Sequence, residues 1–218
     1  VFTALPYNYR KALQGLGASS PKVVGVVHGL REFEAVPDRQ YRSYLRDPRA
    51  RLRLLLGQLM PRKNEARHSA QATALVESLG RPVLTDSEHS RAQLAMRVPT
   101  LSAADVSVLR PIVQAGDSGT SPDDLKLPDN YALVLSADRP IKNAMRVVQA
   151  FDRYGENALS HLQLVAIGFR PHQKRSLRRR FPRGFAKTVF LPYQSREALN
   201  QIVRRAACLV FPSLSEGF

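Results

Sequence analysis

The chain has 218 residues, of which 44% are hydrophobic, 7% aromatic and 23% charged. This composition excludes an intrinsically disordered chain, and the length fits one or two globular domains. The chain contains no apolar run near the roughly 20 residues that a membrane-spanning helix needs, and its one cysteine excludes an internal disulfide framework.

The net charge is +15 at pH 7, from 33 basic and 18 acidic residues. A charge of this size attracts anions, so nucleic acid, anionic lipid surfaces and nucleotide-diphosphate substrates are all candidate partners. The other interpretation is an ordinary solvated surface that is rich in arginine. Charge informs association and not fold, so both interpretations stay open.

The first half of the chain alternates between β-forming runs and helical patterns. Val23–Val27 is a β-branched run, typical of a strand that is buried on both faces. Asp86 or Ser87 can cap a helix that runs to about Met96. The further predicted elements are helices over 41–60 and 66–79 and strands over 82–85 and 106–109.

Residues 110–130 have the composition of a loop, with three prolines and two glycines among serines and aspartates. We therefore expect a partial amino-terminal domain over 1–117, a linker over 118–130 and a partial carboxyl-terminal domain over 131–218.

The second half alternates regularly between strands and helices. Strands are predicted over 131–135, 162–167, 188–191 and 207–211, and helices over 142–154, 171–182 and 195–206. Such alternation with short connections indicates βαβ units, so we expect all four strands to be parallel. Cys208 falls in the last strand and is expected to be a core residue and not a nucleophile.

Small and acidic residues follow the last predicted strand. Ser213, Ser215 and Glu216 come directly after it, at the end where open α/β sheets bind ligands. A helix that starts near Gly217 would present free N–H groups to a phosphate.

Two motifs resemble those of the retaining glycosyltransferases of family 4, the group 1 transferases with the GT-B fold. One is Pro-Ser-Leu-Ser-Glu-Gly-Phe at 212–218, and the other is the strand–loop–helix of 131–151, with its Arg-Pro-Ile-Lys-Asn loop. The resemblance implies two Rossmann-like, doubly wound parallel-sheet domains, and the chain is expected to be incomplete at both ends.

The resemblance implies that Lys142 binds the donor diphosphate. At the start of a helix its charge would stabilise the leaving group as the sugar departs. The sequence departs from the family's pattern in having Ser136 in place of glycine and in lacking the arginine that follows it, for which Arg139 is a candidate substitute. The alternative for Lys142 is an ordinary exposed lysine.

The carboxyl-terminal motif supplies the rest of the donor side. The resemblance implies that Glu216 contacts the donor sugar or its phosphate, beside Ser213 and the amides of Gly217 and Phe218. The family's second glutamate would stand at position 224, outside the chain. Without that context, Ser-x-Glu-Gly is a plain helix cap.

Two amino-terminal motifs are weaker. His28 lies where the family has a histidine near the transferred sugar, and Gly29 replaces the usual aspartate. Ser87 and Glu88 resemble a turn of the family that faces the cleft, or they form a capping box. Arg170–Arg183 carries seven Lys or Arg and no acid, which fits a solvated helix face or, alternatively, contact with RNA or an anionic membrane.

The implied activity is transfer of a sugar from a nucleotide-diphosphate donor to a saccharide or lipid-linked acceptor, with retention of anomeric configuration. No cofactor and no metal is expected, because cationic side chains take over the charge of the leaving group. The implied location is the cytoplasm, with peripheral contact at the anionic inner face of the membrane left open and no nucleic acid expected. The alternatives are a basic protein that binds RNA or membranes, and a non-catalytic GT-B relative.

The chain as written is expected not to turn over a nucleotide sugar. The helix that should meet the phosphates lies beyond Phe218, and we expect one face of the second sheet to be bare and prone to aggregation.

Overall fold

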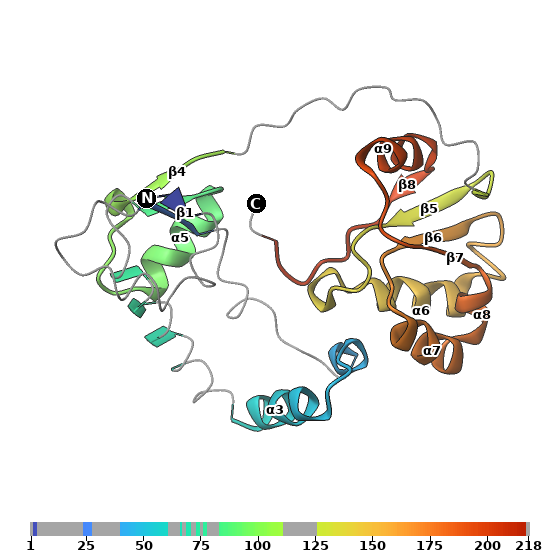
Figure 1. The fold of residues 1–218 in the computed structure, drawn as a ribbon, viewed down its shortest axis with the longest axis horizontal. Helices are drawn as coiled ribbons and strands as arrows, with labels where there is room; N and C mark the ends of the chain where they lie inside the picture. Colours follow the sequence, from blue (N-terminus) through green and yellow to red (C-terminus); the bar gives the residue numbers. More distant parts are fainter. Residues whose placement is uncertain are drawn as a thin grey trace. The chain divides into compact units, whose positions relative to one another are not determined.

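A computed structural model describes residues 2–3, 24–27, 40–60, 66, 69–70, 73–74, 76–77, 83–110 and 126–216. They divide into two compact units, which are described separately (Figure 1). The first unit comprises Val1–Val36, Leu55–Val113 and Ser215–Phe218, and the second comprises Pro37–Leu54 and Gln114–Leu214. Most of the expected linker, 118–130, lies outside the described residues, so the expected domain division stays a prediction.

The first unit contains a parallel sheet in the order β1-β2-β3-β4. Its core joins valines of the strands, among them Val27 and Val83, to Leu94 of helix α5. Ser87 caps α5, because its hydroxyl accepts the N–H of Ser90 at 3.1 Å, as the capping interpretation predicted. The elements are β1 Phe2–Thr3, β2 Val24–Val27, β3 Val83–Thr85, α5 Glu88–Arg97, η3 Ala103–Asp105 and β4 Val106–Val108.

The helix expected over 41–60 is two helices. A 3-10 turn, η2, spans Tyr41–Tyr44, and α3 spans Pro48–Leu59. The break has a local cause, since proline disfavours helical conformation in the residue before it and is well suited to the first position of a new helix.

The second unit has the predicted doubly wound form. Its sheet has the order β7-β6-β5-β8, and every pair is parallel, as expected from the strand–helix alternation. The elements are β5 Tyr131–Val134, η4 Pro140–Lys142, α6 Ala144–Tyr154, β6 Gln163–Ile167, α7 Pro171–Arg180, α8 Pro182–Ala186, β7 Thr188–Leu191, α9 Arg196–Arg205 and β8 Cys208–Leu209.

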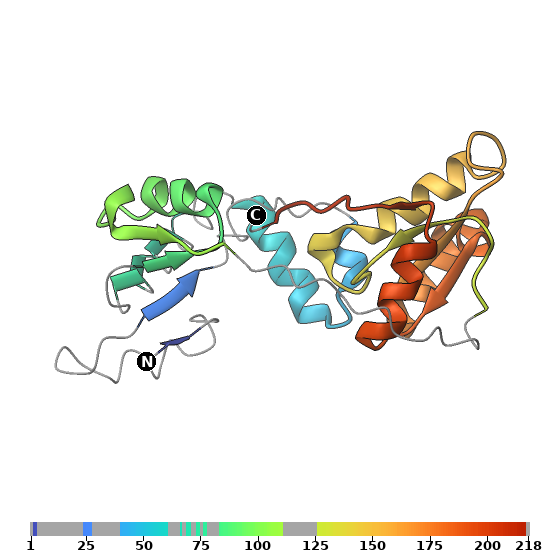
Figure 2. The ribbon, with the colours of Figure 1, turned by 90° about the horizontal axis from the view of Figure 1, so that it is seen from above.

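Alternate residues of the central strands feed two separate cores. Ala132 and Leu164 face α6 and α7, whereas Leu133 and Val165 pack with Ile202 of α9. Helices α6, α7 and α8 therefore cover one face of the sheet and α9 the other (Figures 1 and 2). The expectation of a bare face is wrong for these central strands, because α9 supplies the covering apolar side chains.

The last strand differs from expectation. Strand β8 is shorter than the predicted 207–211, and both of its residues are exposed, including Cys208. Cys208 was expected in the core, but β8 is an edge strand that pairs only with β5 among the described strands. Position in the sheet, and not the apolarity of the run, sets its burial.

The described residues include no helix with the length and apolar character needed to cross a membrane. Across the same ranges, no three His, Cys, Asp or Glu side chains are grouped so that they could hold a metal ion.

Candidate anion site at the carboxyl edge of the second sheet

The loop after β5 is shaped by two residues with left-handed backbone. Ser136 has φ 50° and Asn143 has φ 55°. Between them, Arg139 N–H donates to the Ser136 carbonyl at 3.0 Å and the turn η4 leads into α6. The Ala137 N–H donates to the Ile167 carbonyl at 2.8 Å, so the loop is held against the end of β6. It is therefore a fixed loop at the carboxyl edge of the sheet.

Lys142 lies in this loop, at the edge where the sequence placed it. It is the last residue of η4, and its amine is 5.0 Å from the centre of the Phe211 ring, which follows β8. A cation over an aromatic ring is held by the ring's electron-rich face. Lys142 is therefore half-buried against the segment that carries the carboxyl-terminal motif.

The amide groups at the start of α6 are partly occupied. The Met145 N–H donates to the hydroxyl of Tyr44 at 2.7 Å, and the Arg146 N–H donates to the Asn143 carbonyl at 3.0 Å. Because these donors are already used, a phosphate near this loop would depend on side-chain cations and not on these two amides.

The segment after β8 is tied to the Lys142 loop. The Leu214 N–H donates to the Ile141 carbonyl at 2.8 Å, and the Asn143 side-chain amide donates to the Pro212 carbonyl at 3.1 Å. Between these two contacts, the Ser213 hydroxyl is buried and has no hydrogen-bond partner within the described part of the chain. A buried hydroxyl without a partner is unusual, and a ligand oxygen would satisfy it.

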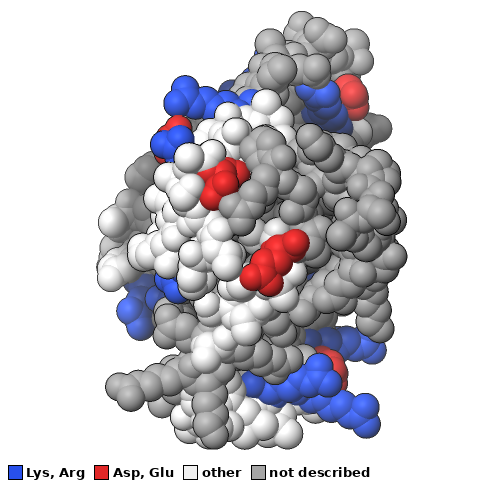
Figure 3. All heavy atoms as spheres, turned by 90° about the vertical axis from the view of Figure 1, so that its left-hand side faces the viewer, with Lys and Arg blue, Asp and Glu red and all other residues white. Residues whose placement is uncertain are grey.

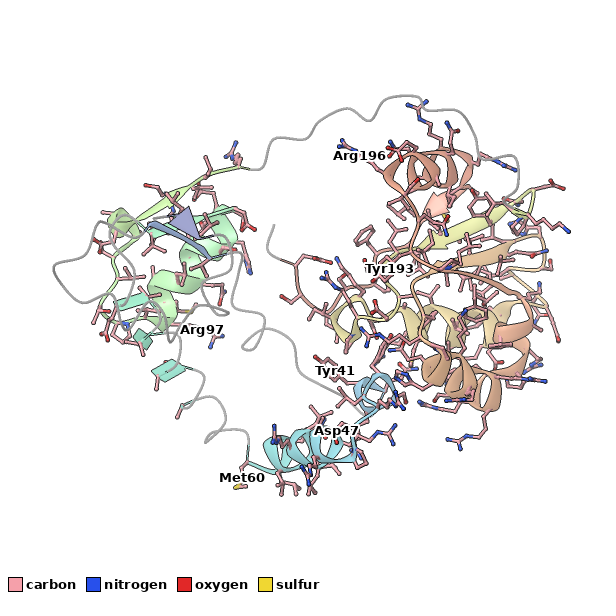
Figure 4. All side chains as sticks on the ribbon, viewed as in Figure 1. Tyr41, Asp47, Met60, Arg97, Tyr193 and Arg196 are labelled. Atoms are coloured by element: carbon pink, nitrogen blue, oxygen red, sulfur yellow. The ribbon has the colours of Figure 1, made fainter. Side chains whose placement is uncertain are left out.

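Asp138 connects the loops that follow three neighbouring strands. Its carboxylate accepts the Tyr193 hydroxyl at 2.6 Å and the Arg170 guanidinium at 3.1 and 3.2 Å. Its backbone carbonyl accepts the side-chain amide of Gln173 at 3.0 Å. We call Asp138, Arg170 and Tyr193 the acid-linked triad; it joins the loops after β5, β6 and β7 (Tyr193 is labelled in Figure 4).

The pKa of Tyr193 is raised above its ordinary value. Burial is the first cause, followed by the hydrogen bond to Asp138 and the charge of that carboxylate, while Ser136 and Arg139 act in the opposite direction. The phenol therefore stays protonated at neutral pH and remains the donor to Asp138.

Arg139, the candidate substitute for the missing arginine, is exposed. Its charge acts on Tyr193, but its guanidinium makes no hydrogen bond or ion pair with a described residue. It lies at the correct edge of the sheet, and its role in diphosphate binding stays a prediction.

The other predicted site residues are not brought to this edge by the described structure. His28, Gly217 and Phe218 lie outside the described residues, as does Gly29. Glu216 groups with the first unit, so the prediction that it lies beside Lys142 stays a prediction. In the first unit, Glu88 pairs with Arg91 at 2.6 Å on the surface of α5.

Sequence reasoning missed Asp138 and Tyr193, and it treated Arg170 only as the start of a basic run. A usable signal exists, because Arg170 and Tyr193 are polar residues that closely follow strands predicted to be parallel. The sequence does not show that one carboxylate connects them.

The second unit is thus a parallel, doubly wound α/β domain with Arg139, Lys142 and Arg170 in the loops that follow its strands. Within that class, residues 117–218 match the family described as "Glycosyl transferases group 1". No curated protein matches the chain.

One similar solved structure is "lipopolysaccharide outer core galactosyltransferase WaaB apo form". It has 15% sequence identity and a TM-score of 0.48, with 98% of this chain covered. The alignment covers 55% of the galactosyltransferase, so this chain spans about half of its length.

Proposed function

We propose that this protein contributes to transfer of a sugar from a nucleotide-diphosphate donor to a saccharide or lipid-linked acceptor, with retention of anomeric configuration. The observation that carries the proposal is the match of residues 117–218 to the group 1 glycosyltransferases. The position of Lys142 supports it, because this amine lies where a parallel sheet binds ligands.

The proposed chemistry places positive charge where negative charge develops. As the bond from the sugar to the diphosphate breaks, the leaving group gains charge, and a fixed ammonium group nearby stabilises it. Lys142 supplies that cation, and Arg139 is a candidate second one. The Ser213 hydroxyl donates a hydrogen bond to an oxygen of the nucleotide sugar. Glu216, His28 and the amides of Gly217 and Phe218 are proposed to contact the sugar or its phosphate. The proposed reaction uses no metal or organic cofactor.

The test is binding of UDP, GDP and ADP, measured by titration calorimetry. We expect Lys142→Ala to weaken the tightest of these about tenfold, since it removes a charge-assisted contact. Lys126→Ala is the matched control, because Lys126 is an exposed lysine just before β5, at the opposite edge of the same sheet. Equal affinities of the two variants would contradict the assignment of Lys142.

Transfer itself needs a separate measurement. Incubation with UDP-, GDP- and ADP-sugars, followed by NMR of the anomeric proton of the product, would report both turnover and configuration. A product of unchanged anomeric configuration would support the proposal, and an inverted product would contradict retention.

We further propose peripheral contact with an anionic membrane, in the cytoplasm, through helix α3. Leu52, Leu56 and Leu59 form one stripe along this helix and are 56%, 45% and 75% exposed. The helix contains Arg49, Arg51 and Arg53 and no acidic residue. An apolar stripe flanked by arginines suits an anionic lipid surface.

Nucleic acid is not proposed as a partner. On the face drawn in Figure 3, the described basic side chains lie in separate groups and not in one continuous patch. The basic helix α7 buries Gln173 and Leu177 against the second unit and exposes Arg178 and Arg179, as expected for a solvated helix face.

A further inference from the structure

We propose that Arg170 is a cation of the donor diphosphate site and that Asp138 is the residue that positions it. This inference rests on the proposed function, because it assigns further residues to the same anion site. It concerns a side chain in the loop after β6, whereas Lys142 and Arg139 both lie in the loop after β5.

The backbone of Arg170 is fixed at the carboxyl edge of the sheet. Gly168, with φ 106°, turns the chain out of β6, and the next side chain, Phe169, is buried. Arg170 is then the residue at the N-cap position of helix α7, and its N–H donates to the Gln173 side chain at 2.9 Å. The arginine therefore starts from a rigid position beside the loop that carries Lys142.

The guanidinium is only partly engaged. Its Nε and Nη2 atoms donate to the same oxygen of Asp138, at 3.2 and 3.1 Å. Arginine has five N–H donors, so its other edge keeps donors for a second partner. The side chain is 66% exposed despite this ion pair. One edge is held by a carboxylate, and the other is free to make the paired contacts that phosphate oxygens accept.

Unlike Arg170, Asp138 has a largely buried side chain, and both of its carboxylate oxygens accept hydrogen bonds. Its side chain is 9% exposed, and it also accepts the Tyr193 hydroxyl at 2.6 Å. The Tyr193 ring lies over Gly168, where a Cβ atom would meet Cζ at 3.1 Å. A carboxylate close to an anion site opposes the anion by its charge, so its benefit must come from holding Arg170 and Tyr193 in place.

The charge of Asp138 and its positioning of Arg170 have opposite effects on anion affinity. The direction in which the affinity changes in Asp138 variants therefore shows which effect is larger. If Asp138 acts only by charge, both Asp138→Ala and Asp138→Asn will bind a nucleoside diphosphate more tightly than the wild type. If Asp138 positions Arg170, the alanine variant will bind more weakly, and the asparagine variant, which keeps an oxygen acceptor, will recover part of the loss.

The experiment titrates the full chain and its variants with whichever of UDP, GDP and ADP binds most tightly. We expect Arg170→Ala to weaken binding about tenfold and Asp138→Ala about threefold, since the first removes the cation and the second only its support. Glu156→Gln is the control for the charge change. Glu156 is an exposed acid paired with Arg183 at 3.5 Å, and it follows α6 at the other edge of the sheet. Its variant should bind as the wild type does.

The outcomes separate the two proposals. Binding that Lys142→Ala weakens and Arg170→Ala leaves within about twofold would overturn this inference and keep the proposed function. Tighter binding by Asp138→Ala would overturn the positioning role. Absence of binding by the wild type to all three nucleotides would overturn the inference together with the proposed function. Arg170 is largely exposed, so its variant is expected to fold, and thermal unfolding checks this for each protein.

Discussion

Two of the loops at the candidate anion site contain a residue with left-handed backbone. Gly168 has φ 106°, and a Cβ atom there would also meet the Ala137 nitrogen at 3.4 Å. Ser136 has φ 50°, at the position where the resemblance leads one to expect glycine. The loop thus keeps the conformation that glycine favours, although a serine occupies it.

This backbone geometry predicts different changes in stability at the two positions. Gly168→Ala should lower the free energy of unfolding by about 1–3 kcal/mol, because alanine is strained at this φ and its methyl group crowds Tyr193. Ser136→Gly should change it by less than about 1 kcal/mol, since the relief of strain offsets the freedom that glycine adds to the unfolded chain. Urea denaturation measures both. If both variants lose the same free energy of unfolding, the positive φ of Gly168 does not strain the alanine variant.

Tyr131 predicts a pH dependence of stability. It is fully buried, its hydroxyl donates to the Ile202 carbonyl at 2.6 Å, and burial raises its pKa while the charge of Arg205 lowers it. Because folding raises the pKa of Tyr131, its phenol stabilises the folded state fully at pH values below the ordinary pKa of 10.0. This stabilisation is lost as the pH rises above 10.0.

Tyr131→Phe is the variant that tests this. At pH 7 it should lose about 1–2 kcal/mol, because the Ile202 carbonyl loses its buried donor. Above pH 10 the difference in free energy of unfolding from the wild type should shrink. The phenol then ionises in the unfolded wild type, which lowers the stability of the wild type alone. Urea unfolding between pH 7 and 11 measures the difference. A gap that stays constant over this range would contradict the role of Tyr131.

At the scale of elements, the exposed leucines of helix α3 predict that this helix binds lipid vesicles. Leu52→Ser with Leu56→Ser should abolish co-sedimentation of the chain with vesicles that contain phosphatidylserine. Reversing the charge of Arg178, Arg179 and Arg180 in α7 should weaken it no more than about threefold, because that helix exposes no apolar stripe. In a complete, active enzyme the same charge reversal should leave sugar transfer within about threefold. If only the α7 variant loses lipid binding, the lipid contact is made by α7 and not by α3.

The strands of the second unit could be predicted because each combines an apolar run with a breaker. Thr188–Leu191 agrees with the sequence prediction at both ends, and Tyr131–Val134 differs by one residue. Strand β8 was predicted within 207–211, but its exposure was not, because its apolar residues reflect β-propensity while its exposure reflects its place at the edge of the sheet. Helix α8 was missed because proline, arginine and glycine in five residues give no helical periodicity.

The same limit applies to the site. The position of Lys142 in the loop after β5 could be predicted because it lies in a motif that is continuous along the chain. The acid-linked triad could not, because Asp138, Arg170 and Tyr193 come from three loops and meet only when three parallel strands align their carboxyl ends. Local sequence shows each polar residue, but only the sheet order shows which of them are neighbours.

At the scale of the whole molecule, the second unit is discontinuous in sequence. Residues 37–54 group with it, although nearly sixty residues separate them from residue 114. Gln40 donates to Gln149 at 3.0 Å, and His172 contacts the Tyr44 carbonyl at 3.2 Å. The Arg180 guanidinium donates to the Ser43 hydroxyl. This amino-terminal segment therefore packs on the helices that follow β5 and β6.

Tyr44 should carry much of this association. It is buried, and its hydroxyl accepts the N–H of Met145 in the first turn of α6, close to Lys142. Tyr44→Phe leaves this buried N–H without an acceptor, so the second unit should lose about 1–3 kcal/mol of stability. Tyr154→Phe is the control, because Tyr154 is 54% exposed at the other end of the same helix. Hydrogen exchange of the amides of α6 measures the effect in the intact chain. Faster exchange near Met145 in the Tyr44 variant alone is the expected result, and equal exchange in both variants would contradict a stabilising role of the Tyr44 hydroxyl.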